Sequence, residues 1–146
     1  MKLSFTFNTE PKAIQSVRFA RMGRFVNTYQ PKSNKDWKNF IKLQALSQLP
    51  YPFKLIDEAI AISKCHFIFS PLRSFPKYKL KMIEEGKILY KTTKPDLDSN
   101  LLKGLIDALN GIVFKDDSLI VSTNNIKKYY GLEPKIELEI KTINQD

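Results

Sequence analysis

The chain has 146 residues, the size of one ordinary domain, and 42% of them are hydrophobic, which is enough to form a core. It contains no apolar run of about twenty residues, which excludes a membrane-spanning helix, and its first residues lack the apolar stretch of a secretory signal. The single cysteine, Cys65, excludes an internal disulfide and is compatible with a reducing compartment. We therefore expect one cytoplasmic domain over residues 1–146.

The net charge of +9 is unevenly distributed. Residues 1–94 hold 18 basic and 6 acidic residues, a net charge of +12, whereas residues 95–146 hold 6 basic and 9 acidic residues, a net charge of −3. A basic surface beside an acidic centre suits a metal-dependent nuclease, because lysine and arginine bind phosphates and carboxylates bind a divalent cation. Charge alone favours the plainer alternative, a protein that binds nucleic acid and performs no chemistry.

The first half of the chain predicts two strands and a helix separated by a basic segment. Residues 2–8 alternate like a strand, and residues 9–32 have no clear periodicity and are expected to be irregular. A helix is expected over residues 34–48 and a long strand over residues 58–69. The predicted buried face of that helix carries Trp37, Phe40, Ile41 and Ala45.

The second half predicts two helices followed by two strands. A short helix is expected over residues 77–85 and a longer one over residues 99–110, each followed by a glycine. Strands are expected over residues 118–130 and 135–143, the second of which alternates cleanly. The buried face of the longer helix carries Leu101, Leu102, Leu105, Ile106 and Leu109. This order of elements indicates an α/β (α+β) fold, a single compact domain with a mixed β-sheet packed against helices.

A pair of aspartates precedes the longer helix. Pro95 disfavours helix at the residue before it, so the chain should be extended where Asp96 and Asp98 occur, and their side chains should point to the same side. Two carboxylates on one side can bind one cation. Lys103 and Asp107 follow on the polar face of the helix.

A second acidic pair, Asp116 and Asp117, follows the helix. A helix of about eleven residues is roughly 16 Å long, so the chain must run back before the two pairs can meet. Each pattern also has a plainer explanation, because an aspartate before a helix often only caps it and Asp-Asp-Ser is typical of a turn. The residues alone support a metal site and a purely structural role about equally.

The four segments that carry these residues are Lys94-Pro95-Asp96-Leu97-Asp98, Asn100-Leu101-Leu102-Lys103, Asp107-Ala108-Leu109-Asn110-Gly111 and Lys115-Asp116-Asp117-Ser118. This long, internally spaced pattern resembles the RusA family of Holliday-junction resolvases, whose signature reads K/R-P-D-x-D-N-x-x-K-x-x-x-D-A-L-N-G followed by an Asp-Asp pair. The basic residues 11–32 resemble the family's opening loop, and residues 71–94 resemble a Lys-rich insertion. The resemblance covers nearly the whole chain.

The resemblance implies a RusA-like, homodimeric nuclease that depends on Mg²⁺. It implies that Asp96, Asp98 and Asp117 are catalytic carboxylates that bind the metal, and we place the neighbouring Asp116 with them. It implies that Lys103 is the catalytic lysine, which stabilises charge on the phosphate or the leaving group. It leaves Asp107 as a structural residue.

One residue departs from the family pattern. The family has asparagine directly after the second aspartate, whereas Ser99 stands between Asp98 and Asn100 in this chain. The extra residue is either absorbed in a bulge or looser first turn, which keeps Asp98 at the metal, or it costs the site a ligand. We expect the first outcome, because the other parts of the motif are intact.

The implied substrate is a four-way DNA junction, cut by paired nicks in recombination and repair. The residues expected to contact DNA are Arg18, Arg21, Arg24, Lys32, Arg73, Lys77, Lys79, Lys81, Lys91 and Lys94. Phe75 and Tyr78 would either stack on the junction or pack within the fold. His66, the single histidine, is expected to be a packing or surface residue. Two alternatives stay open, a non-catalytic nucleic-acid-binding module and a metal-dependent nuclease acting on other branched or linear DNA.

Overall fold

The strand β4 (Ile60–Phe69) lies at the centre of the main sheet, where neighbours flank it on both sides. The computed structural model describes residues 1–13, 18–22, 25–29 and 32–145, the second and third of these ranges by their backbone only. In this described part of the chain, no helix is both long and apolar enough to cross a membrane.

The other elements are, in chain order, β1 (Lys2–Phe7), β2 (Arg18–Met22), β3 (Phe25–Tyr29), α1 (Lys32–Gln48), α2 (Lys77–Glu84), β5 (Leu89–Tyr90), a π-helical turn (Leu97–Leu102), α3 (Lys103–Leu109), a 3₁₀ turn (Asp117–Leu119), β6 (Ile120–Thr123), β7 (Ile126–Tyr130) and β8 (Lys135–Thr142). Among the described residues, six strands form one mixed sheet. β8 lies between β1 and β4 and is antiparallel to both. β6 and β7 pair in parallel with β4, and β5 pairs antiparallel with β7. The predicted α+β fold with a mixed sheet is therefore confirmed.

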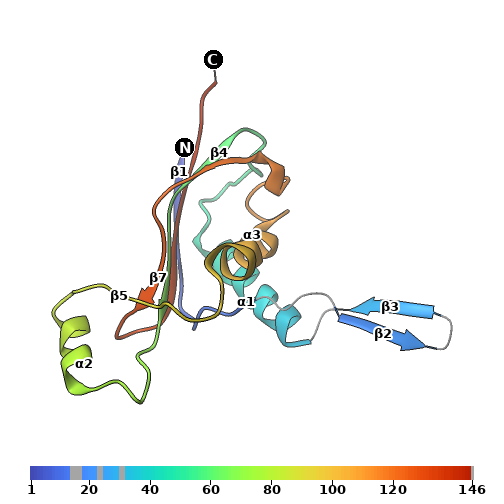
Figure 1. The fold of residues 1–146 in the computed structure, drawn as a ribbon. Coiled ribbons are helices and arrows are strands. Elements are labelled where there is room, and N and C mark those ends of the chain that lie inside the picture. Colours follow the sequence, from blue (N-terminus) through green and yellow to red (C-terminus); the bar gives the residue numbers. More distant parts are fainter. Residues whose placement is uncertain (14–17, 23–24, 30–31, 146) are drawn as a thin grey trace.

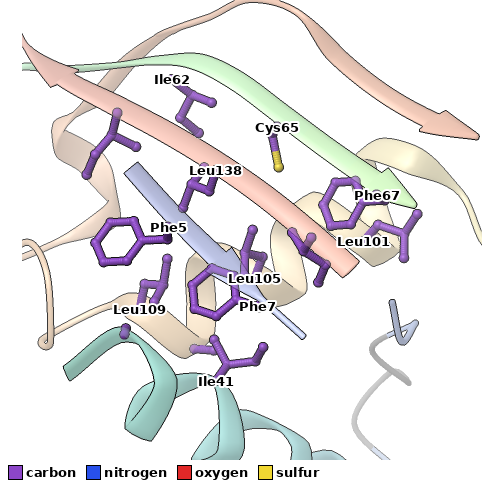
Figure 2. Close-up of a cluster of buried hydrophobic side chains, with 14 of the residues drawn as sticks. Phe5, Phe7, Ile41, Ile62, Cys65, Phe67, Leu101, Leu105, Leu109 and Leu138 are labelled. Carbon is purple, nitrogen blue, oxygen red and sulfur yellow. The ribbon is translucent and has the colours of Figure 1, made fainter. Parts of the chain in front are cut away.

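The helices α1 and α3 pack on one face of this sheet, and α2 lies to the side, near β5 and β7 (Figure 1). The core fills the space between the sheet and these two helices (Figure 2). Phe7 and Phe67 from the sheet, Ile41 from α1 and Leu105 from α3 are all fully buried there. Burial of each such side chain stabilises the fold by about 1.5–3 kcal/mol. The alternation of apolar residues in β1 and their helical spacing in α3 therefore determine which face of each element packs against the other.

Part of the segment that we expected to be irregular over residues 9–32 forms a hairpin, whereas residues 9–13 are irregular as predicted. β2 and β3 pair antiparallel, with Arg18 opposite Tyr29 and Met22 opposite Phe25. Figure 1 shows this hairpin extending away from the main sheet. The prediction missed it because a two-stranded arm outside the core does not need the alternation of apolar and polar residues by which strands are recognised.

The strand expected over residues 118–130 is confirmed only in part, because the range begins in a 3₁₀ turn and its strand is divided into two. β6 and β7 are separated at Asn124 and Asn125, and Asn125 has a φ of 55°, a left-handed conformation that asparagine tolerates better than most residues. The backbone N–H of Asn124 still donates to the carbonyl of Ile62, and that of Cys65 donates to the carbonyl of Asn125. The break thus stays bonded to β4.

Two smaller corrections concern the helices. Phe40, expected on the buried face of α1, is 38% exposed, whereas Trp37, Ile41 and Ala45 are buried as predicted, together with Asn34. The helix expected over residues 99–110 begins at Leu97 and has a π-helical first turn. The short helix α2 and its stop at a glycine with positive φ match the prediction.

Candidate active site

Side chains from three separate segments line one hollow of about 290 Å³ beside α3. The residues around it are Asp98, Leu102, Lys103, Ile106, Asp107, Asp117 and Ile120. Asp98 comes from the π-helical turn, Lys103 and Asp107 from α3, and Asp117 from the 3₁₀ turn that precedes β6. The two acidic segments, which are separated in the sequence by α3, therefore contribute side chains to the same hollow.

The meeting depends on a tight return after α3. This helix has only seven residues, about 10 Å, and Gly111 follows it with a φ of 80°. The N–H of Gly111 donates to the carbonyl of Phe114, which is buried, and the N–H of Lys115 donates to the carbonyl of Ile56. These bonds reverse the direction of the chain and hold it against the segment around Ile56. Asp117 therefore lies beside α3.

Asp116 has a different position from Asp117. Its carboxylate caps the 3₁₀ turn by accepting a hydrogen bond of 3.2 Å from the N–H of Ser118, and it does not line the hollow. Hydrogen bonds from the side chain and backbone of Ser118, with a further one from Asn110, lower the pKa of Asp116. The carboxylate thus connects the end of α3 to the turn that presents Asp117.

Asp96 also lies outside the lining of the hollow. It is extended, as Pro95 predicts, but the helical turn begins at the next residue, so Asp98 is already in a turn and does not continue an extended D-x-D segment. The expectation that the chain is extended through Asp98 is therefore wrong. The carboxylate of Asp96 instead lies 3.3 Å from the ammonium of Lys94.

The extra residue Ser99 lies inside the π-helical turn. The N–H of Leu101 donates to the carbonyl of Asp96, and that of Lys103 donates to the carbonyl of Asp98, both spanning five residues. A π-helical turn holds one residue more than an α-helical turn. It accommodates Ser99 while Leu101 stays buried in the core and Asp98 stays at the hollow.

The charged side chains of the hollow are free of ion pairs with the described residues. Lys103, Asp107 and Asp117 have no salt bridge there, and Asp98 accepts only the N–H of Ser99 at 2.7 Å. Asp107 is half-buried, which raises the cost of leaving its charge uncompensated. The sequence treated Asp107 as structural, although its spacing of four residues from Lys103 places both on one helix face.

The donor set fits a hard divalent cation. In the described part of the chain, no three His, Cys, Asp or Glu side chains form a ready cage for an ion. Magnesium usually needs only one or two carboxylates, because waters and substrate phosphates complete its coordination. Asp98 and Asp117, which both line one open hollow and have no ion pair with the described residues, provide such a pair.

The basic residues divide into exposed side chains and side chains that contact aromatic rings. Lys32, Arg73, Lys77, Lys81 and Lys94 are exposed. Lys79 lies 5.0 Å from the centre of the Phe75 ring, and Lys91 lies above the rings of Phe69 and Tyr130. Arg18 and Arg21 belong to β2, but their side chains, like the whole of Arg24, lie outside the described part of the chain.

Several other residues have partners within the fold. Phe75 packs edge-on against Tyr130 with ring centres 4.8 Å apart, whereas Tyr78 on α2 is 63% exposed. The two ring nitrogens of His66 contact the hydroxyl of Tyr129 at 3.0 Å and the side-chain oxygen of Asn125 at 3.1 Å. Cys65 is buried, and this burial raises the pKa of its thiol.

Comparisons with known proteins show the family to which the chain belongs. Residues 8–141 match the family described as Endodeoxyribonuclease RusA, a range that includes every residue of the hollow. The chain is also similar to the uncharacterized protein YqaN of Bacillus subtilis (strain 168), with 31% identity over 147 residues that cover 97% of each chain. The acidic hollow is thus contained in a family match over most of the chain, and the protein belongs to the RusA family of endodeoxyribonucleases.

Proposed function

We propose that this protein is a magnesium-dependent endonuclease that resolves four-way DNA junctions by paired nicks, in DNA recombination and repair. The observation that supports the proposal best is the convergence of Asp98, Lys103 and Asp117 on one open hollow, in a chain of the RusA family. Two carboxylates and an unpaired lysine are the groups that hydrolysis of a phosphodiester needs.

Asp98 and Asp117, which both line the hollow, would hold the magnesium ion. When bound, the ion lowers the pKa of a water and neutralises charge on the phosphate. Asp96 is the third carboxylate of the set. Its ion pair with Lys94 is exposed and is therefore worth less than about 1 kcal/mol, so a change of side-chain rotamer can release it toward a divalent cation.

Lys103 would act on the substrate directly. Its exposed ammonium lies at the same hollow and has no carboxylate partner among the described residues, so its charge is free to stabilise negative charge on the phosphate or the leaving oxygen. Asp107, one helical turn further on, would contribute negative charge for the cation.

The basic segment around α2 would bind the arms of the junction. Its exposed side chains Arg73, Lys77 and Lys81 can contact phosphates, which recognises the branched shape more than the base sequence. A homodimer would present two such sites related by a two-fold axis. This symmetry matches that of a junction and accounts for nicks in pairs.

A cleavage assay on defined substrates tests the proposal. The protein would be incubated with a synthetic four-way junction, a linear duplex and a flap, each with Mg²⁺ and with a chelator. We expect symmetric nicks in the junction, no cut in the linear duplex, and no activity with the chelator. Tight binding without any cleavage would instead support a non-catalytic module, and cutting of the linear duplex would support a nuclease of different specificity.

A further inference from the structure

Lys128 binds the backbone of the loop that leads into the acidic motif. This lysine belongs to β7, outside the four motif segments, and its ammonium donates hydrogen bonds to the carbonyl of Thr93 at 2.8 Å and of Pro95 at 2.7 Å. Its own carbonyl accepts from the N–H of Lys91 at 3.2 Å. One residue thus bonds the loop at three points, just before Asp96.

The hydrogen bonds of Lys128 differ from those expected of a lysine that binds a DNA phosphate. Its side chain is half-buried, and no acidic side chain in the described part of the chain forms a salt bridge with it. An ammonium has three protons, and two of them are already used by backbone carbonyls. To contact DNA, this lysine would have to give up both bonds.

The constraint passes from Lys128 to the hollow along the chain. Pro95 is followed by Asp96, whose carbonyl accepts the first hydrogen bond of the π-helical turn from Leu101. That turn carries Asp98 into the hollow. A fixed carbonyl at Pro95 therefore sets where the π-helical turn begins and limits the positions that Asp96 and Asp98 can take.

We infer that Lys128 is a positioning residue of the nuclease site, which orients Asp96 and Asp98 through the backbone of the 93–95 loop without touching metal or DNA. This role rests on the proposed function for its effect on cleavage, but not for its effect on the loop. Loss of groups that orient metal ligands typically reduces metal affinity or activity by about 10- to 100-fold.

Three variants separate positioning from DNA contact. Lys128→Met removes the donors and keeps the length of the side chain. Lys127→Met removes the same charge from the neighbouring half-buried lysine, which strand alternation places on the other face of β7. Lys128→Arg keeps donors at the original position and is the conservative rescue.

We expect Lys128→Met to lower kcat by about 10- to 100-fold, and to weaken binding of Mn²⁺ measured by calorimetry. Its KM and junction affinity should equal those of Lys127→Met, and Lys128→Arg should recover part of the lost kcat. Amide hydrogen exchange over residues 92–98 should become faster in Lys128→Met and stay unchanged in Lys127→Met.

The inference is overturned if Lys128→Met cuts junctions as fast as Lys127→Met, or if exchange of the loop does not change. A selective loss of junction affinity in Lys128→Met would show a DNA contact instead. Thermal melting would show whether Lys128→Met is folded. If it is not, Lys128→Gln takes its place, because its side chain is shorter and has fewer donors than lysine. A full kcat in this variant would contradict the inference. A wild-type protein that cuts no junction would refute the proposed function, whereas the exchange experiment would still decide the role of Lys128.

Discussion

Asp117 reaches the hollow from the short 3₁₀ turn, and its position is set by the cap that Asp116 forms with Ser118. Substitution of Asp117 by asparagine keeps the shape of the side chain and removes its charge. We expect Asp117→Asn to lose cleavage by at least about 100-fold, because a cation ligand is lost. Junction binding should be retained or strengthened, because a negative charge near phosphate is removed.

Asp36→Asn is the matched control, because Asp36 is an exposed aspartate on α1 and undergoes the same chemical change. Single-turnover cleavage and a mobility-shift assay with calcium in place of magnesium would measure the two properties separately. Loss of junction binding by a folded Asp117→Asn protein would contradict the role of this carboxylate.

Asp107 provides a second prediction at the scale of one residue. It is half-buried at the hollow without a hydrogen bond or an ion pair in the described part of the chain. Since its charge adds to that of Asp98 and Asp117, we expect Asp107→Asn to weaken Mn²⁺ binding several-fold, measured by calorimetry without DNA. An unchanged affinity together with a large loss of thermal stability would show that Asp107 is structural, as the sequence motif suggested.

The π-helical turn is the element in which this chain differs from the family pattern. Its hydrogen bonds over five residues are rare in proteins and need support from packing, which the buried Leu101 provides here. Deletion of Ser99 would let an α-helical turn replace it. The shift would be taken up by residues 96–98, between the Pro95 carbonyl that Lys128 binds and α3, so that α3 stays in place.

We therefore expect the Ser99 deletion to fold with a melting temperature equal to or above that of the wild type, and to retain junction cleavage. Thermal melting and the cleavage assay would measure the two effects. Deletion of Ser122 from β6 is a useful contrast, since a deletion within a strand shifts the pairing register with β4. A destabilised Ser99 deletion would show that the packing of the whole helix requires the extra residue.

The elements predicted from sequence were those that pack on the core. β1, β8 and α2 match their predicted ranges to within one residue, because their apolar side chains repeat with the period of a strand or a helix. The hairpin of β2 and β3 and the break between β6 and β7 were not predicted. Their form depends on backbone pairing and on a left-handed Asn125, and neither leaves a periodic pattern.

For the molecule as a whole, one ion pair on the sheet gives the protein a pH-dependent stability. The ammonium of Lys64 lies 2.8 Å from the carboxylate of Glu137, and each side chain is about one third exposed, 34% and 29%. The hydrogen bond from Lys64 lowers the pKa of Glu137, and the same bond raises the pKa of Lys64. Such a pair contributes about 1 kcal/mol at neutral pH.

The sign of the effect follows from the lowered pKa of Glu137. The ionised Glu137 contributes to the free energy of unfolding at any pH above its ordinary pKa of 4.5. This contribution is lost as the pH falls through the lower pKa that Glu137 has in the folded protein. We expect Glu137→Gln to melt a few degrees below the wild type at pH 7, and this difference to disappear in acid. Glu133→Gln, at an exposed glutamate without a salt bridge in the described residues, should show no comparable difference at either pH.

The sequence by itself indicated the family, predicted the chemistry of the site and determined most of the core. The motif residues and their spacing are local properties of the chain, so they can be recognised before folding is known. They identify Asp96, Asp98, Lys103 and Asp117 as one set, and the structure brings the last three of these, but not Asp96, to one hollow.

The tertiary structure alone decided which carboxylates share that hollow. Asp96 faces Lys94 because the helical turn begins one residue after it, and Asp117 joins the lining because the chain turns back after the short α3. Lys128 reaches the loop from a strand more than 30 residues away. These positions depend on turn geometry and on contacts between distant segments. Such contacts arise only when the whole chain packs, and for that reason no local pattern contains them.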